Sequence, residues 1–318
     1  MKTIKAPVSV VVPVYNSEKS LEILYARLSA AMNAAGRGFE LILVDDGSRD
    51  ASWEIVCRLS STHANVQGLR MLRNYGQHNA LLCGIRSASH RIIVTMDDDL
   101  QNPPEEAYKL IDKLEEGYDV VYGPPIKQTH GLFRDMASTL TKVVLQSAMG
   151  AEAARNLSAF RAFRTELRRA FVDYRGSYVS IDVLLTWGGR RFAAVPVRND
   201  SRVYGKSNYT FRKLVSHAIN ITTGFSTLPL KLASVAGIAC SIFGMLVLAK
   251  VLYSYFLHGS SVPGFAFLAS VISIFSGAQL FSLGIFGEYL SRMHVRSMDK
   301  PSYTIGETTA EQGDSSKL

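Results

Sequence analysis

One nearly uncharged stretch constrains this chain more than any other feature. Leu232–Phe286 contains a single charged residue, Lys250, and the turn-forming sequence HGSSVPG at His258–Gly264 divides it. Because about 20 apolar residues cross a bilayer core, we predict two transmembrane helices, at Leu232–Leu257 and Phe265–Tyr289. A buried helical hairpin of a soluble protein is the alternative, although such hairpins normally keep one polar face.

The basic residues around these spans predict their orientation. Lys and Arg flank both outer ends, whereas the connecting turn has neither: Arg212, Lys213 and Lys231 precede the first span, and Arg292, Arg296 and Lys300 follow the second. By the positive-inside rule both outer ends face the cytoplasm. The opening sequence MKTIKAPVSVVVPVYN has too short an apolar run for a signal peptide.

Composition excludes some classes of protein and leaves others open. The net charge of +8 is compatible with nucleic acid, anionic lipid or phosphorylated small molecules as partners. Cys57, Cys83 and Cys240 are far apart and form no C-x-x-C pattern, so neither a disulfide framework nor a thiolate zinc site is indicated. A reducing compartment is therefore expected.

The first 200 residues alternate between strand-like and helix-like segments. Helix-length segments with apolar residues three and four apart, such as Leu21–Met32, separate short β-rich runs. This alternation predicts an α/β fold with a mostly parallel sheet and helices on both faces. The predicted strands are Val8–Val14, Phe39–Val44, Val66–Leu72, Arg91–Met96 and Asp119–Gly123.

Three predicted strands end in polar sequence. YNSE (Tyr15–Glu18), DDGSRD (Asp45–Asp50) and DDDLQN (Asp97–Asn102) each follow an apolar run. Ligands of parallel α/β sheets bind beyond the carboxyl ends of the strands, so a site is expected there. Neither a G-x-G-x-x-G fingerprint nor a P-loop pattern is present, which leaves phosphates to be held in another way.

The acidic run after the fourth strand predicts a metal site. Asp97, Asp99 and Gln101 alternate along what we expect to be an extended segment, so their side chains can converge. Two carboxylates and an amide oxygen suit a hard cation such as Mg²⁺ or Mn²⁺, bridged to a diphosphate. A solvated turn with a helix cap is the alternative. Glu105 and Glu106 are expected to complement the dipole of the next helix.

Four motifs in succession carry a resemblance to a known family. VVVPVYNSE, ILVDDGSRD, RNYGQHNAL and DDDLQNPPEE resemble the landmarks of family 2 glycosyltransferases of the GT-A fold. With two spans after them, the chain is similar to the polyprenyl-phosphate glycosyltransferases, which include dolichol-phosphate mannose synthases, GtrB-type enzymes and undecaprenyl-phosphate aminoarabinose transferases. The resemblance runs from about Val8 to Pro301.

The resemblance implies a reaction and a set of partners. A nucleotide sugar, UDP-linked, would give its sugar to a lipid such as undecaprenyl phosphate with inversion, assisted by Mg²⁺ or Mn²⁺, for modification of the cell envelope. The nucleotide sugar, the polyprenyl phosphate and membrane lipid are then the partners, without nucleic acid, and a homo-oligomer such as a tetramer is expected. The location would be the bacterial inner membrane, with a multi-pass chain and a cytoplasmic catalytic domain.

Donor-binding residues follow from the resemblance position by position. Pro13, Tyr15, Asp45 and Asp46 would line the nucleoside pocket, and Asp97 would lie near the ribose or the metal. The alternatives from the residues alone are a strand-end turn for Pro13, a packed ring for Tyr15 and a helix cap for Asp45. The metal would be held by Asp99, Gln101 and Asp97.

Basic residues would meet the two phosphate groups. Arg134 and Ser138 lie four apart on a predicted helix and, with Lys127, would bind the acceptor phosphate. SRVYGKSNYTF resembles a family loop that closes over the donor diphosphate, through Arg202, Lys206 and Ser207. The residues expected to carry the chemistry are Asp97, Asp99, Arg134 and Arg202.

Two positions depart from the family pattern. Asn208 replaces a Lys of the closing loop, and Asn156 replaces an Asp often proposed as the catalytic base. A lipid phosphate monoester is largely a dianion at neutral pH, since its second pKa is about 6, so a base is dispensable. A catalytically idle membrane subunit that binds nucleotide sugars and a processive polysaccharide synthase are the alternatives. The Q-x-x-R-W motif that is typical of processive polysaccharide synthases does not occur in this sequence.

The predicted organisation has four parts. A cytoplasmic catalytic domain is followed by an interfacial amphipathic helix, two transmembrane helices and a cytoplasmic tail. Their predicted ranges are 1–208, 209–229, 230–290 and 291–318.

Overall fold

A computed structural model describes residues 5–126, 157–176, 178–200, 228–258 and 264–310 of the chain. The chain divides into two compact units. Unit 1 comprises Met1–Leu214 together with Asp299–Leu318, and unit 2 comprises Val215–Met298. Apart from its last two residues, the predicted interfacial helix at 209–229 lies outside the described residues.

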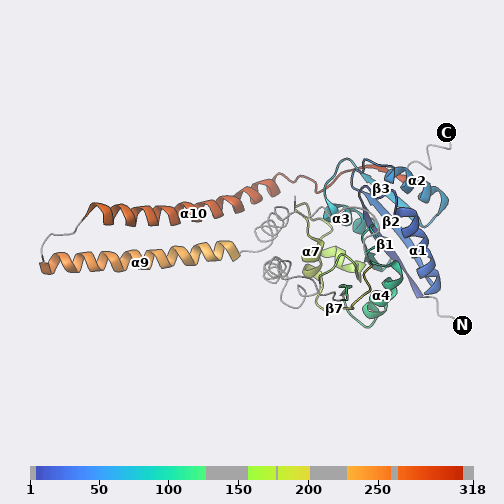
Figure 1. The fold of residues 1–318 in the computed structure, drawn as a ribbon, viewed down its shortest axis with the longest axis horizontal. Helices are drawn as coiled ribbons and strands as arrows, with labels where there is room; N and C mark the ends of the chain where they lie inside the picture. Colours follow the sequence, from blue (N-terminus) through green and yellow to red (C-terminus); the bar gives the residue numbers. More distant parts are fainter. Residues whose placement is uncertain (1–4, 127–156, 177, 201–227, 259–263, 311–318) are drawn as a thin grey trace. The chain divides into compact units, whose positions relative to one another are not determined.

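Unit 1 is built on an eight-stranded sheet with the order β7-β5-β6-β4-β1-β2-β3-β8 (Figure 1). Strands β4, β1, β2 and β3 are parallel neighbours, whereas β6 is antiparallel to β4 and β5, and β8 is antiparallel to β3. The α/β prediction is confirmed for a mixed sheet, and each of the five predicted strands corresponds to one of β1 to β5. The strands are β1 Lys5–Val14, β2 Arg37–Asp45, β3 Val66–Met71, β4 Ile92–Thr95, β5 Val120–Tyr122, β6 Arg161–Arg164, β7 Phe192–Ala194 and β8 Ile305–Thr308.

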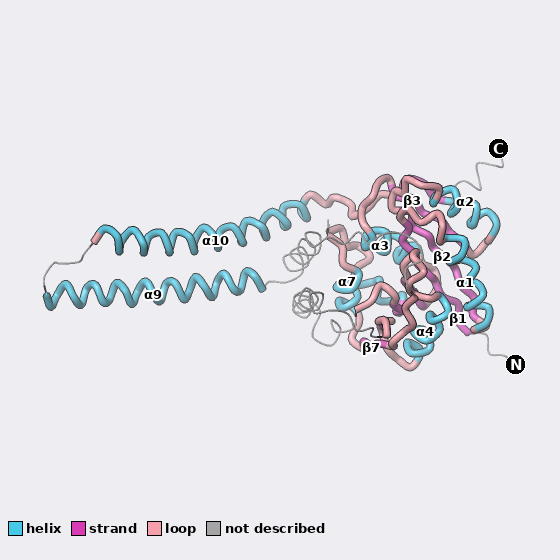
Figure 2. The backbone as a smooth tube through the Cα atoms, viewed as in Figure 1, coloured by secondary structure: helices cyan, strands magenta, loops and turns pink. Residues whose placement is uncertain are grey.

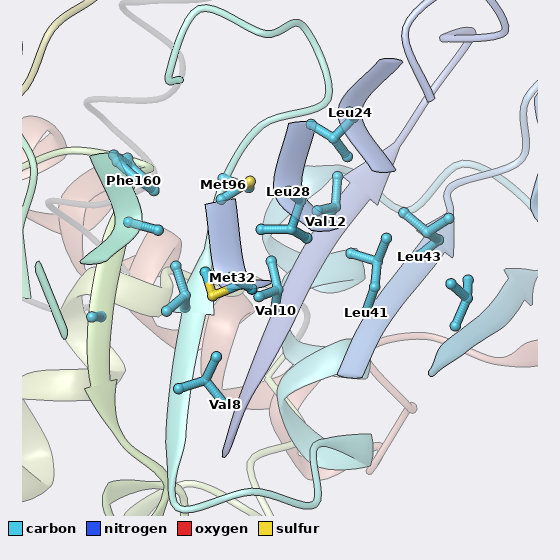
Figure 3. Packing of buried hydrophobic residues seen from close by; sticks show 14 of the residues in the cluster. Val8, Val10, Val12, Leu24, Leu28, Met32, Leu41, Leu43, Met96 and Phe160 are labelled. Carbon is cyan, nitrogen blue, oxygen red and sulfur yellow. The ribbon is translucent and has the colours of Figure 1, made fainter. Parts of the chain in front are cut away.

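Helices cover both faces of this sheet, because β1 is apolar on both sides. Val8, Val10 and Val12 pack in one hydrophobic cluster with α1, α2 and α4, and Figure 3 shows Val12 near Leu24 and Leu28. Val11 points to the second cluster, which holds α3 and α7. The described helices of unit 1 are α1 Leu21–Ala34, α2 Ser52–Thr62, α3 Gln77–Ser87, α4 Ala107–Glu115 and α7 Ile181–Gly188, with short 3-10 helices η1 Pro104–Glu106 and η2 Thr165–Ala170.

Unit 2 is described as two long helices, α9 Leu228–His258 and α10 Phe265–Ser297, which lie side by side (Figure 2). The rings of Phe243 and Phe275 stack between them at 6.5 Å. Among the described residues one helix, Leu230–Leu257, is long and apolar enough to cross a membrane, with a mean hydropathy of 2.3. Its apolar side chains are mostly exposed, so the described residues do not cover them.

Candidate active site

The polar loops after β1, β2 and β4 meet at one edge of the sheet. These strands are parallel neighbours, and Val14 pairs with Asp45 at the ends of β1 and β2. Hydrogen bonds join the first two loops: Asn16 N donates to Ser48 Oγ at 3.0 Å, and Arg49 N donates to the Asn16 side chain at 2.8 Å. The structure thus brings together the three segments that the sequence singled out.

Asp98 joins the β4 loop to the β1 loop. Its Oδ2 accepts hydrogen bonds from Tyr15 N at 3.2 Å and from the Ser17 hydroxyl. Burial raises the pKa of Asp98 to about 6, although these two donors oppose the shift. Sequence reasoning gave this residue no role, because its two donors come from a loop 83 and 81 positions away in the sequence.

The acidic segment after β4 is a turn, so the expected extended conformation is wrong. Strand β4 ends at Thr95, and Leu100 has a φ of +61°. This left-handed conformation costs about 1 kcal/mol for a residue with a side chain. Leu100 is only 3% exposed and packs in the core, and burying a leucine contributes about 1.5–3 kcal/mol, which offsets the cost.

Hydrogen bonds orient the two outer aspartates of this turn. Asp99 Oδ1 accepts from Gln101 N at 3.1 Å, and Asp97 Oδ1 accepts from Gln77 Nε2 at 2.6 Å. Gln77 is the first residue of α3, so this helix also contributes to the site. Gln101 O accepts from Asp200 N at 2.9 Å, which ties the turn to the segment before residue 201.

The residues of this turn fit a divalent cation in their chemistry. Asp97, Asp99 and Gln101 present carboxylate and amide oxygens within five residues of one turn, the donors that Mg²⁺ and Mn²⁺ prefer. In the described part of the chain, no group of three or more His, Cys, Asp and Glu side chains could hold a metal ion. Any octahedral site here would therefore need further oxygens from a ligand or water, and the metal assignment stays a prediction.

Asp45 and Asp46 have different roles, which the sequence could not separate. Asp46 accepts from Tyr75 N at 2.6 Å and from Gly76 N at 2.8 Å, and burial raises its pKa to about 6. Because Gly76 has a φ of +95°, these bonds hold the tight turn that leads into α3. Asp46 therefore shapes the edge of the site.

Asp45 keeps one buried oxygen without a hydrogen-bond donor among the described residues. Its Oδ1 accepts from Ser48 N at 3.1 Å, whereas Oδ2 lies 3.4 Å from Arg70 Nε in an ion pair without hydrogen-bond geometry. Burial raises the pKa of Asp45, while Ser48 and Arg70 oppose this shift. A buried, unsatisfied acceptor costs about 1–3 kcal/mol, and a ligand N–H would remove that cost.

The other predicted donor-binding residues differ in exposure. Pro13 is buried in β1 and pairs in register with Val44. Tyr15 is 41% exposed, and its backbone is fixed by Asp98 while its ring stays accessible to a ligand. Their contact with a nucleoside stays a prediction.

The predicted acceptor and closing-loop residues cannot be placed. Lys127, Arg134, Ser138 and Asn156 lie outside the described residues, and so do Arg202, Lys206, Ser207 and Asn208. Their roles stay predictions.

A buried ion pair lies beside the site where β6 begins. Arg161 pairs in register with Thr95, the last residue of β4, and its guanidinium donates to Asp182 Oδ1 at the start of α7. The Arg161 side chain is 2% exposed. His78 of α3 accepts a hydrogen bond from Ile181 N, which supports a structural role for this histidine.

Comparisons with known proteins agree with these observations. Residues 9–174 match the model of a family described as Glycosyl transferase family 2. The chain is 35% identical over 98% of its length to the undecaprenyl-phosphate 4-deoxy-4-formamido-L-arabinose transferase of Yersinia enterocolitica, of which it covers 96%. A protein of the same name from Photorhabdus laumondii is 33% identical over 96% of this chain and 94% of that protein.

Likeness to solved structures is weaker. Glucosyl-3-phosphoglycerate synthase from Mycobacterium tuberculosis, in complex with Mn²⁺, UDP and glucosyl-3-phosphoglycerate, is 20% identical with a TM-score of 0.49, covering 69% of this chain and 78% of that one. A score at this level adds nothing to the family match.

Proposed function

The chain belongs to glycosyl transferase family 2 and is a polyprenyl-phosphate glycosyltransferase, and from this premise we propose that it transfers a sugar from a UDP-linked donor to undecaprenyl phosphate with inversion. One observation carries the choice of acceptor. The likeness to transferases named for undecaprenyl phosphate extends over 98% of the chain, through the catalytic unit and both long helices.

The reaction is a single displacement at the sugar. A phosphate oxygen of the lipid forms a bond to the anomeric carbon while the bond from that carbon to the nucleoside diphosphate oxygen breaks. The nucleophile is already largely a dianion at neutral pH, because the second pKa of a phosphate monoester is about 6. The protein then has to position the two substrates and balance the charge of the leaving diphosphate.

At the donor edge, Asp45 is the residue best suited to recognise the nucleoside. Its Oδ2 is a buried acceptor without a hydrogen-bond donor among the described residues, and the imide N–H of uracil is a donor of the required kind. Asp46 and Asp98 support this recognition indirectly, because they fix the backbone of the loops on either side.

Asp99, Gln101 and Asp97 would hold the divalent metal, which when bound neutralises charge on the leaving diphosphate. Asp97 is oriented by Gln77 at the start of α3, and Asp99 by the backbone of its own turn. Arg202, Lys206 and Ser207 would close over the diphosphate. Lys127, Arg134 and Ser138 would bind the acceptor phosphate, with Arg134 and Arg202 taking part in the chemistry.

The second membrane span is supported by a topological argument. Unit 1 contains residues on both sides of the α9–α10 hairpin, and β8, which follows α10, is hydrogen-bonded to β3, which precedes α9. Paired strands must lie on the same side of a membrane, so the chain between them crosses an even number of times. If α9 crosses, another segment between β3 and β8 must cross back, and the long helix α10 is the candidate for it, which supports a multi-pass inner-membrane protein. The Lys and Arg residues outside the two helices favour the cytoplasm for both ends.

Transfer assays with the full chain in membranes test this function. Radiolabelled nucleotide sugars, UDP-linked and others, would be supplied with undecaprenyl phosphate, and lipid-linked label would be counted. The screen would include the formamido-arabinose donor for which the relatives are named. We expect a lipid-linked product whose formation needs both the polyprenyl phosphate and one UDP-sugar.

The Asp45→Asn and Arg134→Ala variants locate the two substrates. Asp45→Asn should raise the donor KM, and Arg134→Ala should raise the acceptor KM by about ten- to a hundredfold, the loss expected for one charge-assisted hydrogen bond to phosphate. An effect of Arg134→Ala on the donor alone would place the lipid phosphate elsewhere. Nucleotide binding without transfer to any lipid would instead favour the idle-subunit alternative.

A further inference from the structure

The segment after the second long helix is part of the catalytic unit. Helix α10 ends at Ser297, and two residues later, at Asp299, the chain re-enters unit 1. Backbone and side-chain bonds fix this segment: Leu72 N donates to Thr304 O at 3.0 Å, and Gly68 N donates to Thr309 Oγ1 at 2.9 Å. A tail for which the sequence predicted no structure thus forms β8, the edge strand of the sheet.

Glu307 of β8 is held by two donors. It pairs in register with Arg70 of β3, and its Oε1 accepts from Arg70 Nη1 at 3.1 Å. Its Oε2 accepts from the indole N–H of Trp53 at 3.2 Å, and the Arg70 guanidinium lies 5.7 Å from the centroid of the same Trp53 ring. The carboxylate therefore has a defined position beside β3.

Arg70 is shared between this carboxylate and the donor pocket. Asp45 pairs in register with Arg70 across β2 and β3, and Arg70 Nε lies 3.4 Å from Asp45 Oδ2. Asp45, Arg70 and Glu307 therefore form a row of alternating charge across three adjacent strands. The contact to Glu307 meets hydrogen-bond criteria and the contact to Asp45 does not.

The row of charges explains how the buried Asp45 carboxylate can be balanced by Arg70 and still bind a ligand. The Asp45 side chain is 0% exposed and needs a nearby positive charge, but a full hydrogen bond from Arg70 would compete with a ligand N–H for the same oxygen. Arg70 is 35% exposed and lies against that oxygen. Glu307 supplies a competing partner for the Arg70 guanidinium. The guanidinium can therefore balance the charge of Asp45 and leave Oδ2 available for a hydrogen bond from a ligand.

We infer that Arg70 and Glu307 are positioning residues for donor binding: Glu307, on the strand that follows the membrane helices, holds the Arg70 guanidinium beside Asp45 Oδ2 without satisfying it. The inference rests on the proposed function, since it assumes that Asp45 receives the nucleoside. It assigns the C-terminal segment a part in binding the substrate as well as in completing the sheet.

The test measures nucleotide binding to the full chain in lipid nanodiscs. UDP, CDP and GDP would be titrated with MgCl₂ by calorimetry, and the tightest ligand kept as the probe. Glu307→Gln keeps the shape and an acceptor for Trp53 but removes the charge that competes for Arg70. We expect the Kd to rise about two- to fivefold, as for the loss of a half-exposed ion pair, with the acceptor KM unchanged.

Glu22→Gln is the matched control. It makes the same change in another Glu–Arg pair, with Arg58 at 2.6 Å, and should leave the Kd unchanged. Arg70→Gln and the double variant Arg70→Gln with Glu307→Gln complete a cycle. If Glu307 acts through Arg70, the double variant binds the probe as Arg70→Gln does.

The outcomes separate the inference from the function on which it rests. A wild-type protein that binds the probe, with Glu307→Gln matching Glu22→Gln, overturns the inference and leaves the function standing. A further loss from Glu307→Gln in the Arg70→Gln background also overturns it, since the glutamate would then act through the tail as a whole. A wild-type protein that binds none of the three nucleotides and transfers no sugar overturns both.

Discussion

The carboxyl edge of the sheet and the two long helices differ in opposite ways from the usual arrangement, in which charged groups are exposed to water and apolar groups are buried. The edge buries charge: Asp45 and Asp46 are 0% and 3% exposed. The helices expose hydrocarbon: Phe256 and Met245 of α9 are 81% and 71% exposed. Burying a charge and exposing a large apolar surface each cost free energy, so each needs a compensating partner.

The difference lies in where the partner comes from. At the edge, the protein supplies it, since backbone N–H groups and Arg70 surround the carboxylates. Along α9, the described protein supplies almost none, because only 6% of the most apolar window is buried. On the proposed function, a ligand would complete the hydrogen bonding at the edge, and lipid would cover the apolar surface of the helix. Four predictions test this comparison, and they are ordered by decreasing effect.

Removing a metal-binding carboxylate should have the largest effect. If Asp99 holds the ion, Asp99→Ala should reduce transfer by about a thousandfold, because a bound metal contributes several kcal/mol of charge stabilisation. EDTA should have the same effect on the wild type, with recovery on adding Mg²⁺ or Mn²⁺. Asp112→Ala, in the exposed pair with Lys5, is the control. Full transfer in EDTA would refute the metal assignment.

Breaking the buried pair beside the site should destabilise unit 1. Arg161→Met leaves Asp182 without its cation and should lower the free energy of unfolding by about 3–5 kcal/mol, whereas adding Asp182→Leu should restore most of it. Arg58→Met, in a pair whose side chains are 58% and 60% exposed, should cost about 0–1 kcal/mol. Denaturant unfolding of the variants measures all three. An equal loss of unfolding free energy in the single and double variants would show that the destabilisation comes from lost packing and not from the unpaired charge of Asp182.

Replacing one exposed isoleucine in each unit by lysine compares a surface expected to face lipid with a surface expected to face water. Ile242 of α9 is 56% exposed and Ile23 of α1 is 42% exposed, so accessibility alone predicts similar tolerance. If lipid surrounds α9, Ile242→Lys should cost about 2.5–3.5 kcal/mol and reduce membrane insertion, whereas Ile23→Lys should be neutral. Fractionation of expressing cells measures the inserted share. Equal tolerance of both lysines would contradict the membrane assignment of α9.

The buried aspartates predict a smaller, pH-dependent effect. The pKa of Asp98 is raised to about 6 from 3.8, so the folded state binds this proton more tightly than the unfolded state. Its contribution to stability is fully present below about pH 4 and is lost as the pH rises to about 6, by about 1–3 kcal/mol.

The Asp98→Asn variant removes this titration. Its unfolding midpoint should rise relative to the wild type between pH 4 and pH 7, because only the wild type loses the contribution. Asp112→Asn, at an exposed site, should show a constant difference over the same range. A constant difference for Asp98→Asn as well would mean that the pKa of Asp98 is not raised.

Local pattern was sufficient for the fold of the central region. Alternating apolar runs and helical spacing predicted strands β1 to β5 and the helices between them, because adjacent parallel strands need only local apolar sequence and a crossover. The strands at the two sides of the sheet were not foreseen. Strands β7 and β8 are three and four residues long, and their pairing depends on chain segments far away in sequence.

The candidate site was predicted in part. The sequence located its three loops correctly, because the carboxyl ends of parallel strands gather at one edge of the sheet, where polar residues can face a ligand. It misjudged the turn at Leu100, since a positive φ in a leucine depends on where the side chain can be buried. It also gave equal roles to Asp45 and Asp46, which differ in the backbone N–H groups that face them and in the contact that Asp45 makes with Arg70.

The membrane-length apolar stretch, the acidic loops and the motifs of a glycosyltransferase were all evident from the amino-acid sequence. These depend on residue types and local spacing, which a chain carries before it folds. Folding in three dimensions was needed to show that Asp98 joins two loops, that Asp45 Oδ2 has no hydrogen-bond donor among the described residues, and that Glu307 contacts Arg70. Such contacts depend on distances between residues up to 237 positions apart, and packing alone sets those distances.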